Sequence, residues 1–143
     1  MTRSAALVSI ALVAVSCAAA AERGEGPVAY DRTDAMDQDV IAQLKRNGSD
    51  VTKPTDVVHY LYIPARRDAE EASRRLAAAG YRSAVDAPLG KLPNGTVEKR
   101  YSVVAHKTMV PSLGNVRRAR TLFESLAHRF GGEYDGWEAA VVK

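Results

Sequence analysis

The spacing of hydrophobic residues along the chain changes between the periods of helices and strands. Spacings of three and four residues predict helices over three ranges, 31–47, 66–79 and 112–130. Short runs rich in Val, Tyr and Ala predict strands over four ranges, 56–63, 81–87, 97–109 and 133–142. After the first helix the order is β-α-β-β-α-β, which is the split βαβ unit of ferredoxin-like folds. We therefore expect an α+β domain with a four-stranded antiparallel sheet, both later helices on one face, and an extra N-terminal helix.

Turn and capping residues agree with these boundaries. Asn47-Gly48 and Gly131-Gly132 are stop signals at the ends of two predicted helices, and Ser112 is a suitable N-cap for the last one. Pro93-Asn94-Gly95 predicts a hairpin turn between two strands. Residues 56–63 are apolar on both faces apart from His59, which is typical of a central strand.

The first 21 residues have the layout of a secretory signal. A basic start at Arg3 precedes an apolar run over 5–15 and small residues over 16–21. The apolar run is shorter than the ~20 residues that a membrane-spanning helix needs. Cleavage after Ala21 would leave residues 22–30 as a flexible tether and 31–143 as the folded domain. This layout predicts an exported protein.

Cys17 offers a second form of export. Ala14-Val15-Ser16-Cys17 is similar to a bacterial lipobox, in which the Cys becomes the lipidated first residue. The predicted location is therefore the periplasm, either soluble or lipid-anchored through Cys17 in the bacterial envelope. The alternative is a mis-assigned start and a cytoplasmic protein. Because Cys17 is the single Cys, a disulfide framework and a Cys-based zinc cluster within one chain are excluded.

The charge balance does not predict a nucleic-acid partner. The 143 residues carry 20 Lys and Arg against 17 Asp and Glu, a net charge of only +3. Residues 66–129 are basic and both flanking stretches are acidic. The arginines of the second and third helices are expected on solvated faces. Tyr60, Tyr62 and Tyr101 lie on predicted central strands, but the aromatic motif of RNA-binding sheets is missing.

Catalytic and metal-binding motifs are scarce. His59 and His106 fall on strands that neighbour each other in a ferredoxin-like sheet, where they could share a face as a metal half-site or a pH-sensitive pair. No Cys, HxH or HExxH spacing supplies further ligands, so no metal site is predicted. The sequence also lacks the GxSxG, P-loop and GxGxxG motifs. We predict no enzyme and no cofactor; an envelope enzyme or metal-binding protein using the two histidines is the alternative.

The C-terminal tetrapeptide Tyr134-Asp135-Gly136-Trp137 is the most distinctive element of the chain. It follows Arg129-Phe130-Gly131-Gly132-Glu133 at the end of the last helix. Upstream are the segments Asp39-Val40-Ile41-Ala42-Gln43-Leu44, Asn47-Gly48-Ser49-Asp50 and His59-Tyr60-Leu61-Tyr62. Together these segments resemble the regulator of ribonuclease E activity B family over about residues 34–142.

The resemblance implies a ferredoxin-like domain that inhibits ribonuclease E by binding its non-catalytic region, without catalysis or cofactor. Family members are typically strongly acidic, whereas this chain is weakly basic, and an exported protein does not meet cytoplasmic ribonuclease E. We therefore expect a protein partner of unknown identity in the envelope, or ribonuclease E if the protein is cytoplasmic. The expected contact residues are Tyr60, Tyr62, Asp135 and Trp137. The alternative for Trp137 is an anchor of the last strand to the core.

Overall fold

The computed structural model describes residues 33–143, which form three helices and six strands. The predicted signal segment 1–21, with Cys17 and Ala21, and the tether 22–30 lie outside the described residues. The elements in chain order are α1 (Asp34–Arg46), β1 (Thr55–Ile63), α2 (Arg66–Ala78), β2 (Arg82–Asp86), β3 (Gly90–Lys91), β4 (Val97–Glu98), β5 (Tyr101–Met109), α3 (Leu113–Phe130) and β6 (Glu133–Ala139). No helix in this part of the chain is both long and apolar enough to span a membrane.

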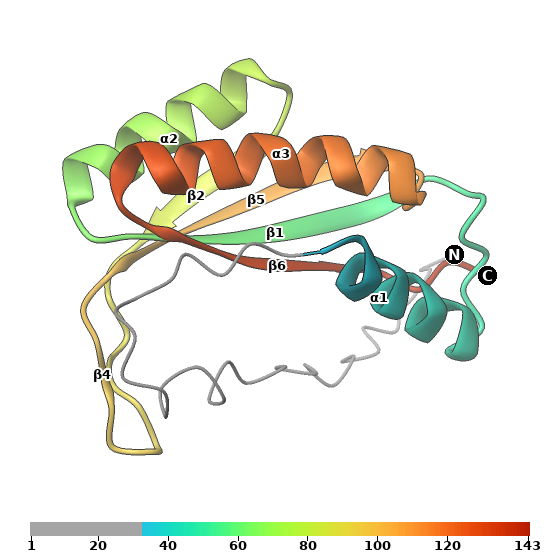
Figure 1. The fold of residues 1–143 in the computed structure, drawn as a ribbon, viewed down its shortest axis with the longest axis horizontal. Helices are drawn as coiled ribbons and strands as arrows, with labels where there is room; N and C mark the ends of the chain where they lie inside the picture. The colour runs from blue at the N-terminus through green and yellow to red at the C-terminus, as the bar shows by residue number, and fades with distance from the viewer. Residues whose placement is uncertain (1–32) are drawn as a thin grey trace, which may run out of the picture.

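Four of the strands form one antiparallel sheet in the order β2-β5-β1-β6. Helices α2 and α3 lie together on one side of this sheet, and α1 lies beside β6 near the start of α3 (Figure 1). The predicted ferredoxin-like α+β fold with an additional N-terminal helix is therefore confirmed. Strand β1 is central, as its apolar composition predicts.

Alternation along β1 shows which side of the sheet holds the core. Every second residue of β1, from Thr55 to Ile63, is buried, and the residues between them are half-buried. The main core cluster joins this buried side to α2 and α3, with Leu61, Leu76 and Phe123 completely buried. A second cluster joins Leu44 of α1 to the same side of the sheet. The core thus occupies the helical side of the sheet.

The helix ends follow the capping signals. The side chain of Ser112 accepts a hydrogen bond from the N–H of Asn115, and that of Thr33 accepts one from Met36. Gly131 ends α3 in the left-handed region, with φ of 63°. Helix α1 begins at Asp34, three residues after the predicted start, because Thr33 caps it there.

The predicted strand over 97–109 is divided in the structure. Its first two residues pair with β3 in a separate two-stranded ribbon, and β5 begins at Tyr101. The predicted turn at Pro93-Asn94-Gly95 closes this ribbon. We call residues 87–100 the arm. The arm projects from one end of the sheet, on the side away from α2 and α3 (Figure 1).

Candidate partner-binding face

The side of the sheet away from α2 and α3 presents the alternate residues of all four strands. We call this surface the open face. Its members on the two central strands and their neighbours follow from the register: Val58 pairs with His106 and Glu138, Tyr60 pairs with Val104 and Gly136, and Tyr62 pairs with Ser102 and Glu133. On β2, Ala84 pairs with Val104 and Asp86 pairs with Ser102, so both also lie on the open face. The centre of the open face is therefore aromatic and apolar.

The two tyrosines of the open face each have an acidic neighbour. The hydroxyl of Tyr60 donates to Glu138 at 2.5 Å. Burial raises the pKa of Tyr60 well above its ordinary value, and the hydrogen bond to Glu138 raises it further. Burial also raises the pKa of Tyr62, and the charge of Asp135 adds to this effect. The structure thus brings the predicted residues Tyr60, Tyr62 and Asp135 to one region.

A bulge in β6 explains the position of Asp135. The register between β1 and β6 shifts between Tyr60 and Leu61, so Tyr134 pairs with Leu61 while Gly136 pairs with Tyr60. Asp135 is the extra residue between these two pairs, and its side chain is exposed. Gly136 has a φ of 113°, which favours glycine and permits the bulge. The Asp-Gly signal in the sequence therefore corresponds to a feature that presents a carboxylate next to Tyr62.

Charged groups lie at both ends of the open face. At one end Asp56 accepts a hydrogen bond from Arg82 at 3.0 Å, and its other carboxylate oxygen lies 2.9 Å from Nδ1 of His106. At the other end Arg100 binds Glu133 at 2.9 Å, and its guanidinium carbon lies 5.0 Å from the centroid of the Tyr62 ring. The face is thus an apolar and aromatic centre between two polar ends.

Trp137 lies on the other side of the sheet. It pairs with His59 rather than with Tyr60, and it is only 6% exposed within the cluster that joins α1 to the sheet. Its indole donates to the buried carboxylate of Asp37 at 2.9 Å. The structure therefore separates Trp137 from the two tyrosines. Its position is that of an anchor between β6 and the core, the alternative that the sequence left open.

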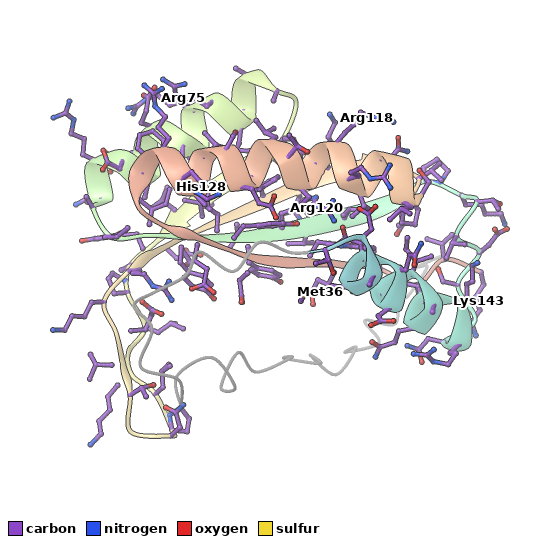
Figure 2. All side chains as sticks on the ribbon, in the orientation of Figure 1. Met36, Arg75, Arg118, Arg120, His128 and Lys143 are labelled. Carbon is purple, nitrogen blue, oxygen red and sulfur yellow. The ribbon has the colours of Figure 1, made fainter. Side chains whose placement is uncertain are left out.

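The sequence did not predict the ionic network that holds α1. Asp37 is completely buried and accepts a hydrogen bond from Arg120 of α3 at 2.6 Å. Arg120 also binds Asp34 at 2.7 Å, and Arg117 binds the same carboxylate through two nitrogens. Figure 2 shows Arg120 between α3 and α1, whereas Arg118 lies on the outer side of the helical layer. Two features of the sequence could have predicted this network: the acidic start of α1 and the basic triplet of α3.

The alternative in which His59 and His106 share a face is contradicted by the strand register. His59 pairs with Ala105 and faces the core, whereas His106 pairs with Val58 and lies on the open face. His59 is completely buried, its Nδ1 is 2.7 Å from the hydroxyl of Tyr134, and its ring stacks on Phe123 at 4.5 Å. Residues 33–143 contain no group of three side chains placed to hold a metal ion. The two histidines therefore cannot form one metal half-site.

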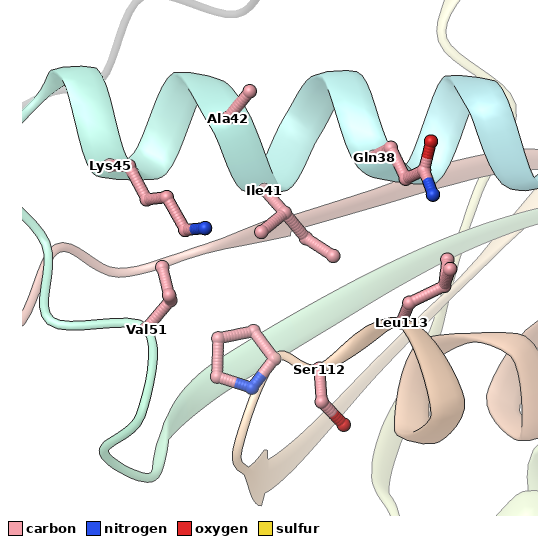
Figure 3. Close-up of a pocket in the computed structure, with 8 residues that line it drawn as sticks. Gln38, Ile41, Ala42, Lys45, Val51, Ser112 and Leu113 are labelled. Atoms are coloured by element: carbon pink, nitrogen blue, oxygen red, sulfur yellow. The ribbon is translucent and has the colours of Figure 1, made fainter.

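A shallow groove separates α1 from the start of α3 (Figure 3). Its volume is about 400 Å³, and its lining is Gln38, Ile41, Ala42, Lys45, Val51, Pro111, Ser112 and Leu113. Ile41 points from α1 into the groove, and Lys45 is the one ionisable group of the lining. This arrangement brings no pair of acid and base together.

The fold and its helix α1 agree with the comparison to known families. The family model of the regulator of ribonuclease activity B matches residues 34–139, from the first residue of α1 to the last residue of β6. The chain belongs to this family. The match covers the open face, the arm and the network around Asp37 alike, so all are parts of the regulator of ribonuclease activity B domain. A search of curated proteins found no match. Family membership supports a regulatory domain of the ribonuclease-inhibitor type.

Proposed function

We propose that this chain is a non-catalytic regulator that binds a protein partner through the open face. The observation that carries the proposal is the position of the half-buried Tyr60 and Tyr62 on the side of the sheet that α2 and α3 leave uncovered. Tyrosine combines a large apolar ring with a polar end, and it is enriched at protein interfaces. Membership of a regulator family agrees with this use of the fold.

The chemistry of the open face favours a partner with both apolar and basic groups. Apolar contact comes from the rings of Tyr60 and Tyr62 and from Val58 and Val104 beside them. Glu138 and Asp135 lie next to the tyrosines and supply negative charge. A partner segment with an apolar anchor flanked by Lys or Arg would satisfy both features.

The location of the protein decides which partner it meets. The signal-like residues 1–21 support export, with a partner in the bacterial envelope and a membrane contact through Cys17 if that residue is lipidated. Membership of the family supports ribonuclease E as the partner if the protein is cytoplasmic. Mass spectrometry of the N-terminus, on protein from fractionated host cells, separates the two locations. A start at lipidated Cys17 or at Glu22 in the envelope supports export, and an intact N-terminus in the cytosol contradicts it.

Site-specific photo-crosslinking tests the open face in either location. A photoreactive amino acid at position 60 or 62 should give a discrete crosslinked species in the native host. The same amino acid at Arg67 or Arg118, exposed on the helical side, is the matched control and should give none. Identification of the crosslinked protein by mass spectrometry names the partner. Crosslinks from the helical positions and none from 60 or 62 would contradict the proposed surface.

A further inference from the structure

The arm carries the exposed hydrophobic side chains of the domain. Among residues 33–143, Leu89 at 70% and Val97 at 57% are the large hydrophobic residues that stand exposed to solvent. Both belong to the arm, on either side of its turn. Lys91 pairs directly with Val97, so these two side chains share one face of the ribbon. Leu89 and Lys99 flank this pair on either side of the ribbon and are exposed as well. We call Leu89, Lys91, Val97 and Lys99 the arm patch.

The ribbon face that carries Lys91 and Val97 is the one away from the open face. The opposite face of the ribbon carries Glu98, which binds Arg100 at 2.8 Å. Arg100 in turn lies over Tyr62 and binds Glu133, both at the edge of the open face. The Glu98 side of the arm is therefore the side toward the open face, and its acidic charge is paired there. The arm patch has two aliphatic side chains, two lysines and no acid, on a surface separate from the proposed partner site.

We propose that the arm patch rests on an anionic lipid bilayer. Lysine is depleted at protein interfaces, where Arg, Tyr and Trp are preferred. At a bilayer, lysine stems lie along apolar surface while their ammonium groups reach the phosphates. The exposed side chains of Leu89 and Val97 supply the aliphatic contact. The turn at the tip, Pro93-Asn94-Gly95, is polar, so the ribbon lies flat in the headgroup region instead of inserting its tip.

The geometry leaves both surfaces usable at once. The arm projects from the end of the sheet opposite α1 (Figure 1), and its Glu98 face, opposite to Val97, is the one linked to the open face through Arg100. A domain resting on its arm patch would therefore keep Tyr60 and Tyr62 available to a protein. The inference does not depend on the proposed partner, because its test needs only lipid.

Quenching by brominated lipid tests the position of the arm directly. The full chain with Leu89→Trp is mixed with vesicles of brominated phosphatidylcholine, with or without phosphatidylglycerol. The native Trp137 is 6% exposed, and its background fluorescence is measured in the parent chain. We expect fluorescence from position 89 to be quenched on the anionic vesicles. Arg118→Trp, on the outer side of α3, is the matched control and should remain unquenched.

Charge variants then test the lysines. Each lysine near an anionic bilayer changes the partition coefficient by about fivefold, so Lys91→Gln with Lys99→Gln should raise the lipid concentration for half-quenching by about 25-fold. Lys45→Gln with Arg46→Gln removes the same charge from the exposed end of α1. This control should leave the lipid concentration for half-quenching unchanged. Equal effects of the two pairs would overturn the proposal, because diffuse charge would then explain binding. Absence of quenching at position 89 in a folded chain would also overturn it, and would favour an acidic protein surface as the occupant.

Discussion

The indole nitrogen of Trp137 donates a hydrogen bond to the buried carboxylate of Asp37 across 100 positions of sequence, at 2.9 Å. This contact joins the last strand to the first helix. Asp37 also binds Arg120 of α3, so one carboxylate connects three elements that are remote in the chain. A buried carboxylate needs such donors, because the loss of its hydration is otherwise uncompensated.

Replacing Trp137 with Phe should weaken the domain without changing the open face. The variant keeps an aromatic ring in the cluster with Leu44 and Val57 but removes the donor to Asp37. Loss of a hydrogen bond to a buried charged group costs about 1.5–3 kcal/mol. Urea unfolding measures the change in the free energy of unfolding, and crosslinking from position 60 should persist. Loss of crosslinking in a fully folded variant would instead assign Trp137 to the partner surface.

Arg120 and Arg117 should differ sharply in their contribution to stability. The side chain of Arg120 is 12% exposed and binds the completely buried Asp37, so Arg120→Met leaves a buried charge without this partner. Breaking such a pair costs about 3–5 kcal/mol. Arg117 is half exposed and binds the half-exposed Asp34, where water screens the pair, so Arg117→Met should cost much less than Arg120→Met. Equal destabilisation in thermal or urea unfolding would contradict the importance of the buried pair.

Acid should weaken the attachment of α1 through Asp34. Hydrogen bonds from Arg117, and next from Arg120, lower the pKa of Asp34 from 3.8 to about 2. Because the folded pKa is the lower one, this contribution is present above pH 3.8 and is lost as the pH falls toward 2. The titration midpoint of Asp34, measured by NMR of its carboxylate, should lie near pH 2, and Arg117→Gln should raise it. If the Asp34→Asn variant lost as much stability between pH 4 and pH 2 as the parent domain, Asp34 would not be the cause of that loss.

Two adjacent glycines should respond differently to alanine. A Cβ at Gly132 would lie 2.1 Å from the carbonyl oxygen of Tyr62, so the start of β6 would have to move away from β1. A Cβ at Gly131 meets nothing within 4 Å, and Gly131→Ala should cost only the ~1 kcal/mol of a left-handed conformation. Gly132→Ala should therefore be clearly the more destabilising in urea unfolding. If Gly131→Ala were the more destabilising of the two, the backbone at Tyr62 would be able to move away from the added methyl group.

The sequence predicted the fold because helix and strand periods, caps and turns all agree with it. Ser112, Gly131 and the Pro93-Asn94-Gly95 turn have the roles that their chemistry indicates. The arm was missed as a separate ribbon; at the break before Tyr101, Arg100 binds both Glu98 and Glu133. Glu133 is distant in sequence, and local patterns carry no information about such a partner.

The candidate site was predicted in part, and the errors have one cause. Tyr60 and Tyr62 are two residues apart on one strand, so period two alone places them on one face. His59, His106 and Trp137 lie on three strands, and their faces depend on the register between those strands. A shift of one residue moves a side chain to the opposite side of the sheet. The bulge that presents Asp135 is likewise a property of the pairing between β1 and β6.

The attachment of α1 to β6 also determines when the domain can become complete. Strand β6 pairs with the central strand β1, and the backbone N–H of Asp50 bonds the carbonyl of Val142 at 2.6 Å. During synthesis, the donor that Trp137 supplies to Asp37 is made 100 residues after its acceptor. Contacts of such long sequence separation form slowly. Helix α1 therefore gains its attachment only after β6 has been made, and loss of residues 134–143 would remove the edge strand and the contacts of the first helix together.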